Sequence, residues 1–250
     1  MIGLDVFKEY FKEYAEQYVL IGGAACDIIF EEQDTAFRAT KDLDMVLIVE
    51  ALTPEFGRRF WQFVRDGGYE NRAKSTGAPQ FYRFEKPKTA GFPYMIELFS
   101  RTEDTLRSED AGPCIPLPLG DELSSLSAIL LNEDYYSMLL KGKTVLSDIA
   151  VLSHTYLIPF KAKAWLDLRD RKSKGQHVDE KDIRKHKNDI LRLATLLAGT
   201  EQCELPDPVR RDIALFIDNL RSESVDLKAL KISGITFEDI LTVLEQVYLG

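Results

Sequence analysis

The chain has 250 residues, of which 45% are apolar, so it is long enough for one large domain or two smaller ones with a sizeable core. Its formal net charge of -9 argues against indiscriminate nucleic-acid binding, which needs many Lys and Arg to neutralise phosphates. Cys26, Cys114 and Cys203 are widely spaced and follow no metal-ligand pattern, so they indicate reduced thiols rather than a disulfide framework. An amphipathic start, and no apolar run near the roughly 18 residues of a membrane span, lead us to expect a soluble, cytoplasmic protein.

The first informative stretch joins a short strand to a helix. An amphipathic helix over 4–17 is followed by the apolar run Tyr18–Ile21, then by Gly22-Gly23 and a helical pattern over 24–32. Glycine lets another group approach the backbone closely, and the exposed N–H groups of a helix start attract anions. The glycine pair therefore indicates either a phosphate site or a plain strand-to-helix turn.

The second apolar run starts at Asp42 and continues to Val49. Residues two apart in a strand share a face, so Asp42 and Asp44 should project together while Leu43 and Met45 face the other way. Two neighbouring carboxylates repel each other unless a positive charge lies between them, and a divalent metal is the natural candidate. Arg38 and Lys41, in the polar loop before this strand, are either phosphate contacts or solvated charges.

A helix capped by Thr53 and ending near Gly67 comes next, and then the pattern changes to period two. The runs over 81–87 and 92–100 should pair as a hairpin. Glu97 lies inside the second run between Ile96 and Leu98, where a carboxylate needs a partner. If this strand lies beside the Asp42 strand, Glu97 completes a cluster of three carboxylates; otherwise it is a Glu on the exposed face of an edge strand.

The remainder of the chain changes from mixed to helical composition, and we expect a domain boundary near His154. The expected elements are a strand over 123–131, a short helix over 133–140, a strand or extended segment over 144–152, and helices over 156–171, 179–197, 208–221 and 237–248. The sequence thus predicts two domains, residues 1–154 and 155–250.

The helical part has a local basic excess. Between Lys161 and Lys187 there are ten Lys or Arg and five Asp or Glu. Lys163 and Arg169 are candidates to contact a phosphate from the first domain, although such side chains more often extend into water. Asp189 falls among apolar neighbours, where it would pair with a basic residue of the preceding helix and orient it.

Taken together, these residues resemble the nucleotidyltransferase fold, and specifically the AbiEii-type toxins of bacterial abortive-infection and toxin-antitoxin systems. The resemblance is carried by the strand ending in Gly22-Gly23, the segment Thr40–Asp44, Glu97, and the segments LIPFKAKAWLDLRDR and KHKNDILRL. It extends over 18–197 and implies an α/β (α+β) fold: a mixed sheet with flanking helices, followed by a helical domain that closes the active-site cleft. Many members have Ser where this chain has Gly23, and Asp is commoner than Glu at the third carboxylate.

The resemblance also implies a mechanism and a set of site residues. A nucleoside triphosphate would lie along Gly22-Gly23, with Lys41, Lys163 and Arg169 as further contacts to the nucleotide. Asp42 and Asp44 would hold Mg²⁺, and Glu97 would be either a ligand of a second metal or the base that deprotonates the acceptor hydroxyl. Lys163 would stabilise the charge that leaves with pyrophosphate.

The sequence leaves several molecules as the acceptor of such an enzyme. The acceptor is a tRNA end, a protein hydroxyl or a small molecule, and the basic helical segment favours RNA. Two alternatives differ in class: a catalytically silent module that binds a nucleotide or a partner, and a nucleotidyltransferase for a small molecule of the aminoglycoside kind. A cognate antitoxin is expected if the toxin interpretation holds.

Overall fold

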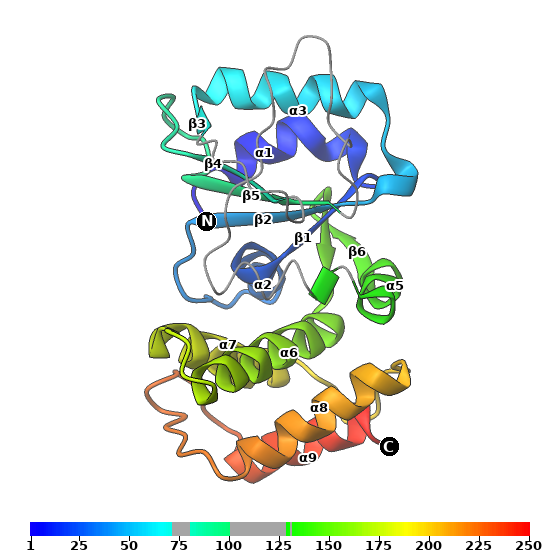
Figure 1. Cartoon of the computed structure of the whole chain (residues 1–250), viewed down its shortest axis with the longest axis vertical. Coiled ribbons are helices and arrows are strands. Elements are labelled where there is room, and N and C mark those ends of the chain that lie inside the picture. The colour runs from blue at the N-terminus through cyan, green and yellow to red at the C-terminus, as the bar shows by residue number, and fades with distance from the viewer. Residues whose placement is uncertain (72–80, 101–128, 131) are drawn as a thin grey trace. The chain divides into compact units, whose positions relative to one another are not determined.

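The computed structural model describes residues 1–71, 81–100, 129–130 and 132–250 (Figure 1). The chain divides into two compact units, Met1–Leu119 with Lys143–Ser153, and Gly120–Gly142 with His154–Gly250. The first unit contains a mixed sheet with flanking helices and the second is built from helices, which confirms the predicted fold class. Within the described ranges, no helix has the length and apolar character that a membrane crossing requires.

The sheet of the first unit has seven strands in the order β3-β4-β5-β2-β1-β7-β6. The pairs β2/β5 and β1/β7 are parallel, and the other neighbours are antiparallel. The predicted hairpin is formed by β4 and β5, and its second strand lies beside the Asp42 strand as the three-carboxylate interpretation required. The strands are β1 (Tyr18–Ile21), β2 (Asp42–Leu47), β3 (Glu70–Asn71), β4 (Phe81–Glu85), β5 (Met95–Phe99), β6 (Lys143–Leu146) and β7 (Ile149–Leu152).

Helices cover both faces of this sheet (Figure 1). The helix α1 (Leu4–Phe11), its continuation η1 (Lys12–Tyr14) and α3 (Pro54–Gly67) lie on one face, and α2 (Gly22–Glu31) lies on the other. Aromatic rings fill the first interface, which explains why the apolar residues of β2 and β4 face this way: Phe7, Phe11, Phe56, Phe60, Phe63 and Phe84 are all fully buried. The opposite face of β2 is left for Asp42 and Asp44.

Three segments differ from the sequence prediction. The segment over 144–152 is a hairpin of β6 and β7 rather than one strand, because Ser147 and Asp148 both adopt positive φ angles (46° and 67°) and form a tight turn. A short 3-10 turn, η2 (Val49–Ala51), precedes Thr53, whose hydroxyl caps α3 as predicted. The strand expected over 123–131 falls mostly outside the described residues, and Ile129 and Leu130 are helical.

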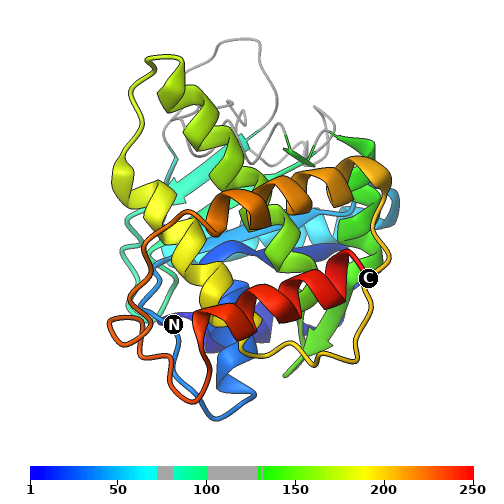
Figure 2. The same ribbon diagram turned by 90° about the horizontal axis from the view of Figure 1, so that it is seen from below.

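The second unit is a bundle of helices. In Figures 1 and 2, α8 and α9 run side by side, and α6 lies between α7 and α8. Trp165 of α6 packs edge-on against Phe216 of α8, with ring centroids 5.2 Å apart, at the centre of this bundle. Its helices are α5 (Glu133–Gly142), α6 (His154–Ser173), α7 (Glu180–Ala194), α8 (Asp207–Leu220) and α9 (Phe237–Tyr248).

Candidate functional site

Three carboxylate residues meet on neighbouring central strands of the first unit. Asp42 and Asp44 share one face of β2, and Glu97 of β5 is in direct register with Asp44. On the other side of β2, Asp44 is in register with Ile21, the last residue before the glycine pair. We call Asp42, Asp44 and Glu97 the carboxylate site. The structure therefore places Asp44 between Glu97 and the strand that leads into Gly22-Gly23.

Gly22 is required by the position of the Asp44 side chain. Its φ of +66° is a conformation that favours glycine, and a Cβ added there would overlap Asp44 Oδ2. The backbone at the start of α2 thus lies directly against this carboxylate. A side chain at position 22 would displace Asp44 and close the space in front of it.

Gly23 lies beside a hydroxyl and a guanidinium group. A Cβ at Gly23 would be 2.5 Å from Thr40 Oγ1 and 3.6 Å from Arg38 Nη2. The residue that precedes α2, Ile21, provides no side-chain cap, so the first N–H groups of this ten-residue helix are available to an anion. Thr40 thus provides a hydroxyl beside the start of α2.

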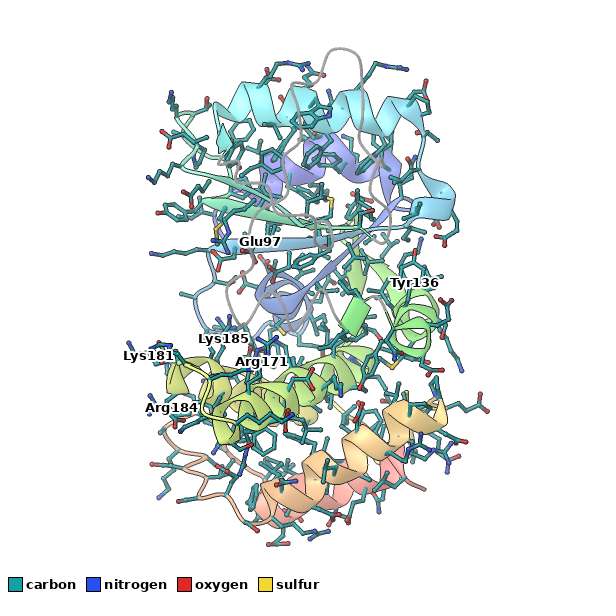
Figure 3. The ribbon with its side chains drawn as sticks, viewed as in Figure 1. Glu97, Tyr136, Arg171, Lys181, Arg184 and Lys185 are labelled. Carbon is teal, nitrogen blue, oxygen red and sulfur yellow. The ribbon has the colours of Figure 1, made fainter. Side chains whose placement is uncertain are left out.

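Glu97 is the most perturbed acid of the carboxylate site. Its side chain is 6% exposed, and Arg83 of β4, in register with it, donates to Oε1 from Nε (3.0 Å) and Nη2 (2.7 Å). Burial, followed by the charge of Asp44 and a hydrogen bond to it, raises the pKa of Glu97 to about 9, although Arg83 acts in the opposite direction. In Figure 3, Glu97 projects from β5 on the α2 side of the sheet.

The raised pKa defines what Glu97 can do without a bound cation. Near neutral pH it holds a proton and donates it to Asp44, so in this state it is not a base for an acceptor hydroxyl. A cation between the two carboxyl groups would favour the ionised form and release that proton. The two predicted roles of Glu97, metal ligand and base, therefore both depend on a cation at the site.

The donor set fits magnesium. Asp42 and Asp44 offer hard carboxylate oxygens from one strand face, and Mg²⁺ is usually held by one or two carboxylates, with water and phosphate oxygens as its other ligands. Asp42 is half-buried and has no hydrogen-bond or ion-pair partner among the described residues. Among the described residues, no group of three or more His, Cys, Asp or Glu side chains is arranged so that it could hold a metal ion.

The basic residues predicted from the helical segment belong to the second unit. Lys163 Nζ lies 3.2 Å from Asp167 and 3.5 Å from Asp212. Burial alone would lower the pKa of Lys163, but these two carboxylates outweigh burial and raise it. Arg169 forms an ion pair with Glu223 (2.7 Å) and stacks on Trp165, 4.3 Å from the ring centroid. Lys41, in the first unit, is exposed and lies 5.7 Å from the ring centroid of Tyr94.

Asp189 has the basic partner that its sequence context predicted, and the partner is Lys161. The Lys161 ammonium donates to Asp189 Oδ2 at 2.9 Å, and both side chains are buried, with 5% and 0% exposed. This ion pair ties α6 to α7. Lys161 and Lys163 therefore differ in environment although they are two residues apart.

Sequence reasoning missed Arg83 and gave Lys161 no role. Helical spacing provided a signal for Lys161, because it recurs with Leu157, Trp165 and Leu168 on the apolar side of α6. For Arg83 the signal was weaker. Its pairing with Glu97 depends on the hairpin register, and the long connection between β4 and β5 does not fix that register.

Comparison with solved structures finds a distant likeness. The chain is similar to an antigenic nucleotidyltransferase-like protein from Paracoccidioides brasiliensis, with 15% sequence identity, a TM-score of 0.43, and coverage of 92% of this chain and 93% of that chain. No family model matches the sequence, and no curated protein matches it. The assignment of a function therefore depends on the geometry of the carboxylate site.

Proposed function

We propose that this protein is a magnesium-dependent nucleotidyltransferase that transfers a nucleoside monophosphate from a nucleoside triphosphate to an acceptor hydroxyl. The observation that carries the proposal is the register of β1, β2 and β5, which places Asp44 between the Gly22-Gly23 backbone and Glu97. A carboxylate pair beside a helix start with available N–H groups combines a cation site with a phosphate site.

The chemistry needs charge neutralisation and positioning more than covalent catalysis. The acceptor oxygen forms a bond to the α-phosphorus, the bond to the β-phosphate oxygen breaks, and pyrophosphate leaves with that oxygen. When bound, magnesium would neutralise phosphate charge and polarise the reacting oxygens. Asp42 and Asp44 would hold it, and the first N–H groups of α2 would hold the phosphates.

Glu97 and Arg83 would act together in this proposal. Arg83 fixes the Glu97 carboxyl by two hydrogen bonds to one oxygen, Oε1. Once ionised, Glu97 would be placed to share a cation with Asp44 or to accept the proton of the acceptor hydroxyl. Lys163 and Arg169 remain proposed nucleotide contacts from the helical unit, and each would have to exchange its carboxylate partner for a phosphate.

The acceptor and the biological role follow from the resemblance and are part of the proposal. A tRNA end or a protein hydroxyl is the proposed acceptor, and a toxin of a toxin-antitoxin or abortive-infection system, acting in the cytoplasm with a cognate antitoxin, is the proposed role. The ten basic residues between 161 and 187 support RNA as the acceptor. The wild-type chain should then arrest growth on expression, whereas an Asp42→Asn/Asp44→Asn variant should not.

The test is transfer of label from an α-³²P nucleoside triphosphate. Purified protein is incubated with each of the four triphosphates, magnesium, and either total tRNA or cell lysate. We expect label on one acceptor class with the wild type, and a loss of about 10³-fold with Asp44→Asn, because the cation contributes several kcal/mol to the transition state.

A matched variant and a binding measurement separate the alternatives. Asp27→Asn removes a carboxylate of α2 that pairs with the N-terminus, outside the carboxylate site, and should retain transfer. Magnesium-dependent nucleotide binding with no transfer to any acceptor, unchanged by Asp44→Asn, would contradict the enzyme proposal and favour a binding module. Transfer only to an added aminoglycoside would support the small-molecule alternative instead.

A further inference from the structure

The second unit contains a surface cavity, and one of its lining residues, Arg169, is also a proposed nucleotide contact. Its volume is about 460 Å³, which is within the range of small-molecule sites. Six charged side chains from α6, α7 and the segment after α8 line it: Arg169, Lys172, Arg184, Lys187, Glu180 and Glu223. Four positive and two negative groups leave a formal excess of two positive charges. We call this the basic cavity.

Glu223 neutralises two of the four cations. Its Oε1 accepts from Arg169 Nη1 and its Oε2 from Lys187 Nζ, both at 2.7 Å. Burial alone would raise the pKa of Glu223, but Lys187 and then Arg169 outweigh burial and hold the pKa below its usual value. The carboxylate thus occupies a position between an arginine and a largely buried lysine, where a ligand's anionic group would be bound equally well.

The other two cations, Lys172 and Arg184, differ in whether a carboxylate neutralises them. Lys172 forms an ion pair with Glu180. Arg184 is exposed and has no hydrogen-bond or ion-pair partner among the residues that the structure describes. Figure 3 shows Arg184 on α7 together with Lys181 and Lys185, near the end of α6 that carries Arg171. Arg184 therefore brings to the cavity a positive charge that no described residue pairs with.

Rigidity is a second requirement for a binding site, and Arg169 meets it. Its guanidinium lies 4.3 Å from the ring centroid of Trp165, which is itself 1% exposed and fixed in the bundle core. Stacking fixes the plane of the guanidinium, so little side-chain entropy is lost when an anion binds. Arginine forks match phosphate oxygens in pairs, which favours phosphate over a spherical anion.

We propose that the basic cavity is a binding site for a small anion that carries phosphate groups, with Arg169, Arg184 and Lys172 as its contacts and Glu223 as an internal competitor. All of these residues belong to the helical unit, so the proposal does not need the Asp42–Asp44 cation site, and Arg169 alone is shared with the proposed nucleotide contacts. A ligand that replaces Glu223 would also release the segment that joins α8 to α9 from α6 and α7.

If Glu223 competes with the ligand, two substitutions should change the affinity for the ligand in opposite directions. Binding of inorganic pyrophosphate to the full chain is measured by calorimetry at low salt in EDTA, which keeps magnesium away from the carboxylate site. Arg184→Gln should weaken binding about tenfold because it removes a charged donor, and Glu223→Gln should strengthen it about fivefold because it removes the competing anion.

Matched control variants remove one positive or one negative charge at positions of the helical unit that lie outside the cavity. Arg211→Gln on α8 and Glu238→Gln on α9 are exposed positions outside the cavity and should change the affinity less than twofold. Thermal unfolding of each variant confirms that it folds, and Glu223→Asp provides a milder substitution if Glu223→Gln does not. The proposal is overturned if pyrophosphate does not bind, if Arg184→Gln and Arg211→Gln weaken binding equally, or if a single-stranded RNA binds through Arg184 while pyrophosphate does not.

Discussion

Two buried acids, Asp189 in the helical unit and Glu97 in the sheet unit, differ in the charges that surround them. Asp189 is 0% exposed and faces the buried ammonium of Lys161 at 2.9 Å. Glu97 is 5% exposed and has Arg83 on one side, but on the other side it faces a second carboxylate, Asp44. The first acid has its countercharge within the fold, whereas the second shares a small buried volume with a like charge.

The difference separates a structural ion pair from a site for which we propose a bound cation. A buried pair with good geometry gains enough attraction to offset its desolvation, and it fixes the relative position of two helices. Two carboxyl groups in one buried site favour a state in which one of them holds a proton, unless a cation lies between them. Folding stability alone therefore accounts for Lys161 and Asp189 but not for the carboxylate site.

The largest effect should follow from removing Lys161. Lys161→Met leaves Asp189 buried without its main countercharge, and it should lower the free energy of unfolding by about 3–5 kcal/mol. Urea unfolding of the full chain measures the change. Lys174→Met removes an exposed i,i+4 partner of Asp170 and should cost no more than about 0.5 kcal/mol.

A double variant tests whether the Lys161 effect comes from the unpaired charge. Lys161→Met/Asp189→Leu replaces the pair with apolar groups and should recover most of the lost stability, because neither charge is then left buried alone. A Lys161→Met variant within 1 kcal/mol of the wild type would show that water or another cation reaches Asp189, and the contrast with Glu97 would then be lost.

Gly22→Ala should cause the next largest effect, about 2 kcal/mol of destabilisation together with loss of transfer. The new Cβ meets Asp44 Oδ2, and a positive φ alone costs a non-glycine residue about 1–2 kcal/mol. Gly175→Ala is the matched control, since Gly175 also has a positive φ (+78°) but no atom lies within 4 Å of its added Cβ. Equal losses in both variants would mean that backbone strain, rather than contact with Asp44, sets the cost.

The sequence predicted the parts of this site that depend on local pattern. Period two placed Asp42 and Asp44 on one face of β2, and the glycine pair marked the end of β1. The apolar neighbours of Glu97 identified it as a carboxylate in need of a partner. These inferences succeeded because each relies on a few consecutive residues whose geometry is fixed by the type of secondary structure.

Most of what the sequence did not predict depends on pairing between distant segments. The partnership of Arg83 with Glu97 is set by strand register, and the turn at Ser147-Asp148 lacks the glycine that usually marks such hairpins. The same holds for the choice between Lys161 and Lys163, since both lie among apolar residues and only packing against α7 shows which one is buried. Tertiary context determined the partnerships of Arg83 and Lys161, whereas the Ser147-Asp148 turn is local and was missed because it contains no glycine.

Glu97→Gln should raise the free energy of unfolding, whereas Lys161→Met should lower it. In metal-free protein the folded pKa of Glu97, about 9, is above its ordinary value, so the folded state binds the extra proton between these two values. Its contribution to stability is complete at pH below the ordinary pKa and is lost as the pH rises towards 9. Gln carries no ionisable proton, and the variant should therefore be more stable than the wild type at pH 8.

The measurement for Glu97 is the unfolding free energy in EDTA from pH 5 to pH 9. The difference between Glu97→Gln and wild type should grow with pH across this range. Added magnesium should stabilise the wild type more than Glu97→Gln. A Gln variant that is less stable than wild type at pH 8 would show that Arg83 alone compensates the charge of Glu97.

The smallest change in stability is expected for Lys163→Gln, and here the contrast between two neighbouring lysines becomes useful. The ammonium of Lys163 is 29% exposed and its two carboxylate partners are 3.2 and 3.5 Å away, so its loss should cost less than about 1 kcal/mol. If Lys163 contacts the triphosphate as proposed, the same variant should raise the KM for the nucleotide about tenfold while unfolding barely changes. Lys163→Arg keeps the charge and should restore part of the affinity, which a purely structural role would not require. An unchanged KM in Lys163→Gln would remove Lys163 from the proposed site and leave its ion pairs with Asp167 and Asp212 as its whole role.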